Sequence, residues 1–318
     1  MRTCDAAAER PIVTIPAVTG RSCLLAMLGA GAISGAIAGA GSAAARIPGN
    51  PLAHSVAASS DSRAEGRAEA SQLQGNFIQG GWLRGAASAD VVSVTLGDQT
   101  LPIDSRGQYF AAFDRDAQAQ AQLTLTYADG RIEKSPLSIA PRKWRIEHVN
   151  VARRSGGTSE AWWKKREPEW NAIQRARAKK TDADGWRQDF IWPVKGRISG
   201  RFGSQRIYRG EPGSYHSGLD IAPGAGKPFV APANGVVVLA VKGFSFEGNL
   251  LIIDHGNGLN SAFLHAQSLA VSEGDTVEQG ELLGRVGSSG RATGPHLHWS
   301  LKWRDARLDP LLFLPDAK

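Results

Sequence analysis

The chain has 318 residues, of which 42% are apolar, and it carries a formal net charge of +7. This length favours two domains over one, and the apolar content is enough for sizeable cores. Both cysteines, Cys4 and Cys23, lie near the N-terminus, which excludes a disulfide framework or a thiolate metal site in the rest of the chain. The basic excess suits an anionic polymer as a partner, although charge alone identifies none.

Residues 1–45 have the features of an export signal. Arg21 precedes a run of Leu, Ala, Gly and Ile, and small residues end the run at Ala45. The pattern predicts a signal peptide that is cleaved near Ala45, with no stable membrane insertion afterwards. An uncleaved anchor is the alternative, because the apolar run is just long enough to span a bilayer; its Gly and Ala content favours cleavage. Residues 46–75 are predicted to be a flexible linker.

Short alternating runs predict a small antiparallel β-sandwich over residues 76–150. Gly97-Asp98 and Asp129-Gly130 are turn signals of the kind that join hairpin strands. The runs that flank these two turns are 91–96, 100–103, 123–127 and 131–139. No cluster of acids, histidines or nucleophiles appears in the domain. Its expected role is binding, spacing or covering a catalytic cleft, and a purely structural spacer is the alternative.

Residues 151–189 are predicted to be a basic, tryptophan-containing helical connector. Ile173, Ala176 and Arg177 have helical spacing, and three tryptophans lie among many Lys and Arg residues at positions 162, 163 and 170. Such a helix is expected to pack its Trp face on a neighbouring domain and to leave its charges in solvent. Nucleic-acid or membrane-surface binding is the competing interpretation. Because no recognisable nucleic-acid fold accompanies the helix, we expect no nucleic-acid partner.

The pattern from residue 190 to residue 318 indicates an all-β domain, so the chain as a whole is predicted to be mainly β. Frequent Gly and Pro turns separate apolar runs, and no long helical period appears. The runs that read as strands include 191–194, 198–203, 229–241 and 283–286. The segment 204–214 reads as a loop that could line a substrate groove with Arg206, Tyr208 and Arg209, although exposed loop charges are ordinary.

Five of the seven histidines fall between His216 and His298. Together with Asp220 they make a candidate metal site, because zinc takes three or four N, O or S ligands and a catalytic site leaves one position open. His296 and His298 project from the same face if they lie in a strand. His216 and Asp220 would be about 13 Å apart in an extended segment. The chain must therefore bend between them, and Gly218 permits a bend because glycine accepts unusual backbone angles.

Two other histidines are predicted to be structural. His255 lies in a turn signal, the segment 254–258, between the strand-like runs 250–254 and 259–264, so a hairpin explains it without a metal role. His148 lies on an apolar run and is expected to be an ordinary strand residue. His54 falls in the predicted linker and is given no role.

The histidine motifs closely resemble those of the M23 family of zinc metallopeptidases, of the LytM or lysostaphin type. The resemblance covers most of residues 190–314 and includes the family's His-x-x-x-Asp and His-x-His signatures in order. It implies that the C-terminal domain is an M23 catalytic domain. It also implies that one zinc ion per chain is held by His216, Asp220 and His298.

The family resemblance further implies that His265 and His296 are a catalytic pair that does not bind the metal. Phe263 stands where the family often has Tyr, and Ala266 stands where it often has Leu. Neither departure affects a ligand position. The glutamate base of zinc peptidases with a His-Glu-x-x-His helix has no counterpart in this sequence.

The function implied by the resemblance is hydrolysis of peptide cross-links or stem peptides of peptidoglycan by metal-activated water. The expected protein is an exported zinc metallo-endopeptidase of the periplasm or cell envelope, with peptidoglycan as its partner. Some relatives have lost metal ligands and act without catalysis, by binding the wall or activating amidases, which is the alternative here. A peptidase that acts on secreted proteins or on competing cells is a further alternative. The oligomeric state and the metal used in the cell stay open.

Overall fold

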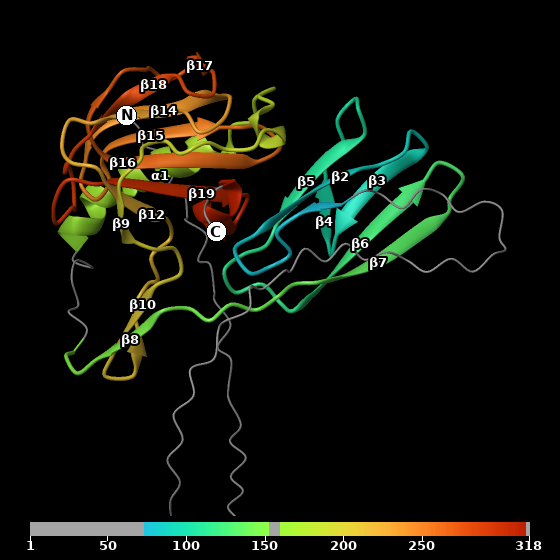
Figure 1. Cartoon of the computed structure of the whole chain (residues 1–318), viewed down its shortest axis with the longest axis horizontal. Coiled ribbons are helices and arrows are strands. Elements are labelled where there is room, and N and C mark those ends of the chain that lie inside the picture. Colours follow the sequence, from blue (N-terminus) through green and yellow to red (C-terminus); the bar gives the residue numbers. More distant parts are fainter. Residues whose placement is uncertain (1–72, 153–159, 316–318) are drawn as a thin grey trace, which may run out of the picture. The chain divides into compact units, whose positions relative to one another are not determined.

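The computed structural model describes residues 73–152 and 160–315. Within these ranges the fold is mainly β, as predicted (Figure 1). The predicted signal peptide and nearly all of the predicted linker lie outside the described residues. No helix in the described ranges is both long enough and apolar enough to cross a bilayer.

Two antiparallel sheets form the N-terminal part, with strand orders β1-β2-β5 and β4-β3-β6-β7. Their strands are β1 (Gln74–Gly75), β2 (Trp82–Ala86), β3 (Val91–Leu96), β4 (Gln99–Leu101), β5 (Gln108–Ala112), β6 (Gln120–Tyr127) and β7 (Ile132–Ser138). The two predicted hairpins are β3-β4 and β6-β7. Gly97 and Gly130 have φ values of 59° and 85° in their turns, a conformation that glycine adopts without a steric penalty. Sequence reasoning did not identify β2 and β5.

The segment after these sheets differs from the prediction. Strand β8 (Ile146–Val149) pairs in parallel with β10 (Gln205–Tyr208), which pairs in turn with β11 (Glu211–Pro212). The stretch predicted to be a groove loop is therefore a small sheet. The side chain of Arg206 donates to its cross-strand neighbour Glu147 at 2.8 Å, which makes an ion pair within this small sheet. His148 is a strand residue, as predicted.

One ten-stranded sheet carries the C-terminal part, and its main path has the order β17-β14-β15-β16-β19-β12-β9. Its strands are β9 (Arg197–Gly200), β12 (Leu219–Ala222), β13 (Pro228–Val230), β14 (Gly235–Phe244), β15 (Gly248–Asp254), β16 (Leu259–Leu269), β17 (Thr276–Val277), β18 (Leu282–Val286), β19 (Leu297–Trp303) and β20 (Ala306–Leu308), with 3-10 helices η1 (Gly185–Arg187) and η2 (Pro310–Phe313). The predicted run 229–241 is two strands, because Pro232 lies at a turn that cannot continue a ladder. The run 191–194 is not a strand.

The sheet buries apolar side chains on both faces. Trp299 and Phe263 are 0% exposed and belong to a large cluster that also contains the buried residues of the N-terminal sheets. A second cluster on β14, β15 and β16 includes Leu250, Ile252 and Leu264 and packs against helix α1 (Glu160–Ala178). Burial on both faces explains why these strands read as nearly continuous apolar runs instead of alternating ones.

Helix α1 uses a different face from the one predicted. Ile173 and Ala176 pack on the sheet, but the three tryptophans stay between 38% and 47% exposed. The prediction that the Trp face packs on a neighbouring domain is therefore wrong, whereas Lys164, Lys165 and Arg175 are exposed, as predicted for the charges. Arg166, 7% exposed, shares the buried face, because its guanidinium forms two hydrogen bonds of 2.6 Å with the Glu247 carboxylate. A buried arginine requires such a partner.

The N-terminal sheets and the C-terminal part share one aromatic contact region. The Trp82 ring lies 5.5 Å from the Phe313 ring, and its Nε1 donates to the Leu312 carbonyl oxygen at 2.8 Å. Arg84 Nε donates to the Trp186 carbonyl oxygen at 2.8 Å. These contacts attach the N-terminal sheets directly to η1 and η2.

His255 is a fully buried residue of the β15-β16 hairpin, as the turn signal predicted. Its Nδ1 donates to the Asn234 carbonyl oxygen at 2.7 Å, and its Nε2 accepts from Ser261 Oγ at 2.7 Å. Both contacts suit a neutral ring. Burial lowers the pKa of His255 to about 4.

This lowered pKa predicts an acid-dependent loss of stability. Between pH 6.5 and about 4 the unfolded imidazole binds a proton that the folded one does not, so the stability contributed above pH 6.5 is lost as the pH falls through this window. The loss is up to about 3 kcal/mol from a shift of this size. Urea unfolding of the protein and of His255→Asn at pH 7 and pH 4.5 measures it. The variant is expected to be less stable at pH 7 but less sensitive to acid. An equal loss in both proteins would contradict the prediction.

Candidate metal centre and groove

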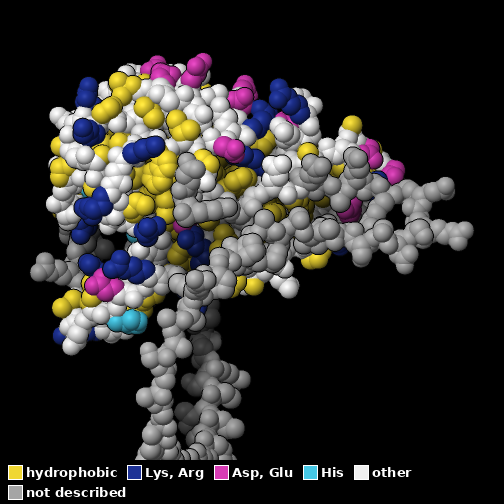
Figure 2. Space-filling view, viewed as in Figure 1, with side chains coloured by type: hydrophobic (Ala, Val, Ile, Leu, Met, Phe, Trp, Pro, Cys, Tyr) yellow, Lys and Arg dark blue, Asp and Glu magenta, His cyan; other side chains and the backbone are white. Residues whose placement is uncertain are grey.

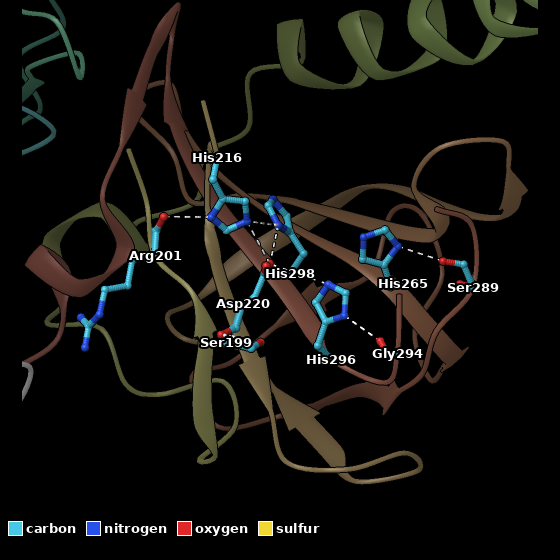
Figure 3. A network of polar contacts seen from close by, with 9 residues as sticks. All are labelled: Ser199, Arg201, His216, Asp220, His265, Ser289, Gly294, His296 and His298. Atoms are coloured by element: carbon cyan, nitrogen blue, oxygen red, sulfur yellow. Dashed lines mark hydrogen bonds and ion pairs between the residues drawn. The ribbon is translucent and has the colours of Figure 1, made fainter. Parts of the chain in front are cut away.

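Three potential metal ligands meet at the junction of β12 and β19. Asp220 on β12 lies directly opposite His298 on β19 in the antiparallel register, so their side chains share one face at close range. His216 precedes β12, and its backbone is held by hydrogen bonds with Ser204 and Gly203 at 2.8 and 2.9 Å. Figure 3 shows the three side chains pointing toward one another.

The ligand atoms are close enough to surround one ion. Asp220 Oδ1 lies 3.0 Å from His216 Nε2 and 2.8 Å from His298 Nδ1, and the two ring nitrogens lie 3.1 Å apart. Tetrahedral ligands of one zinc ion lie about 3.4 Å apart, given bonds near 2.1 Å. The observed triangle is slightly tighter, and two imidazoles with one carboxylate are a donor set that zinc accepts. Three ligands would leave a position open.

The orientation of His216 is fixed by its second nitrogen. Nδ1 donates to the Arg201 carbonyl oxygen at 3.1 Å, which leaves the Nε2 lone pair directed at the cluster. Such a contact selects the tautomer that can bind a metal. Sequence reasoning missed Arg201, and no sequence signal marks it because the contact uses the backbone.

The pKa values at the cluster reflect burial opposed by charge. Burial acts to lower the pKa of His216, but the hydrogen bond and charge of Asp220 raise it above its ordinary value. At His298 burial prevails and lowers the pKa. Burial acts to raise the pKa of Asp220, yet the two histidines hold it well below its usual range. An ionised carboxylate beside a neutral imidazole is the state that metal binding requires.

His265 on β16 and His296 before β19 form a second pair beside the cluster. Their ring centroids lie 4.9 Å apart, and His296 Nε2 lies 3.7 Å from Asp220 Oδ1. Each Nδ1 donates to a backbone carbonyl oxygen at 2.8 Å, from Ser289 for His265 and from Gly294 for His296. In the neutral rings the lone pair is therefore on Nε2. Figure 3 shows both rings beside the Asp220 and His298 side chains.

His265 adopts an unusual backbone conformation, with φ of 66°. This left-handed conformation costs a non-glycine residue about 1–3 kcal/mol and clusters at functional sites. Hydrogen bonds hold it, because the amide of His265 donates to the Glu247 carbonyl oxygen at 2.9 Å. Burial lowers the pKa of the His265 ring.

Gly218 has a role that the spacing did not predict. Its φ is not in the left-handed region, so unusual backbone angles are not the reason for a glycine. A Cβ at this position would lie 2.6 Å from the Trp299 carbonyl oxygen and 2.7 Å from His298 Nε2. Glycine is needed because the His298 ring passes directly over the backbone.

Gly218→Ala is therefore expected to displace His298 and to weaken zinc binding by about 10- to 100-fold, as changes to supporting contacts of a metal ligand do. A competition titration with a zinc-binding dye measures the affinity. Gly294→Ala is the matched control, because a Cβ there meets nothing within 4 Å. Equal zinc affinity in the two variants would show that the close approach does not control the site.

The five residues line a groove of about 450 Å³. β16 and β19 contribute its floor through Ala262, Leu264 and Ser300, and α1 contributes Ile173 and Arg177 to its wall. The sequence predicted α1 as a connector between domains and did not predict that the helix lines the groove. No residue of β1 to β8 is among the described residues that line the groove.

Comparisons with known proteins identify the domain. Residues 214–310 match Peptidase family M23. The chain is 37% identical over 116 residues to the peptidoglycan DD-endopeptidase ShyA of Vibrio cholerae, across 35% of this chain and 26% of ShyA. It is 30% identical over 233 residues to the murein hydrolase activator NlpD of Salmonella dublin, across 72% of this chain and 56% of NlpD.

The fold is also similar to a solved structure from Pseudomonas aeruginosa that is described as an M23 peptidase. The TM-score is 0.57 at 26% identity, over 75% of this chain and 95% of that one. The C-terminal part of the chain is therefore an M23 peptidase domain. The matches span between 26% and 56% of the lengths of the two curated relatives named above, one of which is an endopeptidase and the other an activator.

Proposed function

We propose that this protein is an exported zinc endopeptidase that hydrolyses peptide cross-links or stem peptides of peptidoglycan. The main support is the convergence of five side chains in one groove: His216, Asp220 and His298 around one point, with His265 and His296 beside them. The signal-like N-terminus and the net charge of +7 fit an enzyme of the periplasm or cell envelope that meets an anionic wall. Figure 2 shows Lys and Arg side chains spread over the visible face.

The proposed chemistry divides between the metal and the histidine pair. Zinc held by His216, Asp220 and His298 would lower the pKa of a water molecule and polarise the scissile carbonyl. His265 and His296 present Nε2 lone pairs, since each Nδ1 donates to a carbonyl oxygen. One Nε2 would take the proton of the attacking water and pass it to the leaving amine. The other, when protonated, would donate to the developing oxyanion.

The state of His265 suits proton acceptance. Burial lowers its pKa, so the ring is neutral at pH 7 and able to act as a base. The carbonyl oxygen of Ser289 fixes its orientation at 2.8 Å. A positioned imidazole of this kind contributes about 10²- to 10⁴-fold to the rate of a proton-transfer reaction.

A non-enzymatic role as an activator of wall amidases is the second candidate. It is favoured by the similarity to the NlpD activator, which extends over 72% of the chain. A pure activator has no need for a metal cluster or for a pair of oriented imidazoles. The chain retains all five side chains in one groove, and this favours the enzyme.

Digestion of purified peptidoglycan distinguishes these functions. The zinc-loaded protein is incubated with peptidoglycan alone, with peptidoglycan and an amidase, and with an unfolded protein substrate, and mass spectrometry identifies each bond that is cut. New peptide ends from peptidoglycan alone support the endopeptidase. Sugar-peptide cleavage that the amidase performs faster with this protein than without it, and no new peptide ends from peptidoglycan alone, support the activator; cleavage of the protein substrate alone supports a peptidase with another target. Either of the last two results contradicts the proposed function.

A further inference from the structure

Three basic side chains gather at the end of the groove away from the histidine pair. Arg177 comes from the last turn of α1, Lys302 from β19 and Arg307 from β20, and all three line the groove. Lys302 and Arg307 are direct partners in the antiparallel register. Like charges placed opposite one another in a sheet are destabilising, so the fold holds this cluster at an energetic cost.

The acidic groups nearby offset the charge of the cluster only in part: the backbone amide of Arg307 donates to Asp114 Oδ2 at 2.9 Å, and the charge of Glu247 acts on Arg177. Glu247 lies in the same groove but is engaged by both terminal nitrogens of Arg166 at 2.6 Å. Lys302 Nζ lies 3.6 Å from an Asp305 carboxylate whose side chain is 108% exposed, a contact that contributes little. The guanidinium of Arg307 lies 5.4 Å from the centroid of the Tyr215 ring.

Arg177 supplies the observation that points to a ligand. Its Nη1 is inaccessible to solvent and has no hydrogen-bond partner within the described residues. Burial, with the charge of Arg307 beside it, lowers the pKa of Arg177 to about 10. The pKa of Lys302 is also lowered, first by burial and then by the charge of Arg177. A buried cation without a partner costs free energy, and because Arg177 also lines the groove, an anion there would offset the cost of burying its charge.

The spacing along β19 relates this cluster to the metal centre. His298, Ser300 and Lys302 are two residues apart in turn and lie on the same face of the strand. Lys302 is therefore about 13 Å from His298 along the strand. An extended peptide advances about 3.4 Å per residue, so a peptide cut at the metal centre would reach the basic cluster about four residues from the cut bond.

We propose that Arg177, Lys302 and Arg307 form a carboxylate-binding subsite that holds a free carboxylate of the substrate peptide about four residues from the hydrolysed bond. This inference rests on the proposed function, because it takes the metal centre as the place of cleavage. Guanidinium groups suit the task, since they pair with carboxylates through charge-assisted hydrogen bonds. Helix α1 thus supplies part of the specificity of the groove.

A pair of synthetic stem peptides tests the subsite. The two cross-linked peptides are identical except that one has free side carboxylates and the other has carboxamides. Dissociation constants are measured by calorimetry on zinc-loaded protein that carries His296→Ala, so that no peptide is consumed. The peptide with free carboxylates is expected to bind at least about tenfold more tightly than the carboxamide peptide, because one charge-assisted hydrogen bond contributes about that much. The preference is expected to weaken as salt is raised.

The basic residues are tested in the same background. Arg177→Gln and Lys302→Gln are each expected to remove most of the preference without changing zinc content or the unfolding temperature by more than a few degrees. Arg106→Gln, which removes an exposed arginine from the N-terminal sheets, is the matched control and keeps the preference. If the preference survives in Arg177→Gln, the metal is binding the carboxylate and the subsite is refuted. Equal binding of both peptides by the parent also refutes it.

Cleavage by the unmodified protein separates this inference from the proposed function. If it cuts both peptides with equal kcat/KM and binds them equally, the function stands and the subsite is rejected. If it cuts neither peptide while the carboxylate preference depends on Arg177, the subsite stands and the hydrolase function is rejected.

Discussion

His265→Asn is expected to lower kcat/KM for peptidoglycan hydrolysis by about 10²- to 10⁴-fold while zinc stays bound. Asn is chosen because it adopts positive φ more readily than most residues, and His265 has φ of 66°. An amide cannot accept a proton near neutral pH, although it can still donate to the Ser289 carbonyl oxygen. The loss therefore reports on the imidazole and not on the backbone.

Hydrolysis rates and zinc content are measured on the same preparations of the variant. His148→Asn makes the same chemical change at an exposed position on β8, outside the groove, and is expected to leave both quantities unchanged. If the activity of His265→Asn stays within a factor of about three of the parent, His265 takes no part in the proposed proton transfer. Loss of zinc together with activity would instead assign it a role in holding the metal.

Arg166→Met is expected to destabilise the protein by about 3–5 kcal/mol, the effect of leaving one member of a buried ion pair without its partner. The Arg166 and Glu247 side chains are only 8% and 10% exposed. The Glu247 backbone also accepts from the His265 amide at 2.9 Å. Displacement of Glu247 is therefore expected to lower activity as well, although Arg166 touches none of the groove histidines.

Urea unfolding of Arg166→Met and of the double variant Arg166→Met/Glu247→Met measures the energy of this pair. The double variant is expected to be more stable than Arg166→Met alone, because the unpaired Glu247 charge is gone and Glu169, the other partner of Arg166, keeps its hydrogen bonds from Ser245. A loss below about 1 kcal/mol in the single variant would make this contact equivalent to a surface ion pair. That outcome would show that the ion pair between Arg166 and Glu247 does not fix α1 to the sheet.

Three hairpins of the β framework follow from local patterns. Turn signals at Gly97 and Gly130 placed two of them, whereas His296 lies just before β19 and outside the strand that the two-residue spacing of His296 and His298 suggested. The turn around His255 marked a third hairpin. These predictions succeeded because each depends on neighbours close in sequence, where spacing determines which face a side chain occupies.

The packing of α1 could not be predicted in the same way. The aromatic character of the tryptophans suggested that they would be buried, but Arg166 occupies the buried face because Glu247, 81 residues away, receives it. The contacts that orient His216 and His265 use backbone carbonyls of Arg201 and Ser289, which any residue type provides. The need for glycine at position 218 arises from the His298 ring, which only the folded register brings there.

The most direct test of the zinc hydrolase is a joint measurement of metal content and cleavage of a cross-linked peptidoglycan dimer, on the same samples of the protein and of His216→Ala. The protein is expected to hold about one zinc ion per chain and to convert the dimer to monomers, and His216→Ala is expected to lose both the zinc and the conversion. A protein that holds zinc at one ion per chain and leaves the dimer intact would contradict the hydrolase. Cleavage at an unchanged rate by zinc-free His216→Ala would contradict the metal centre.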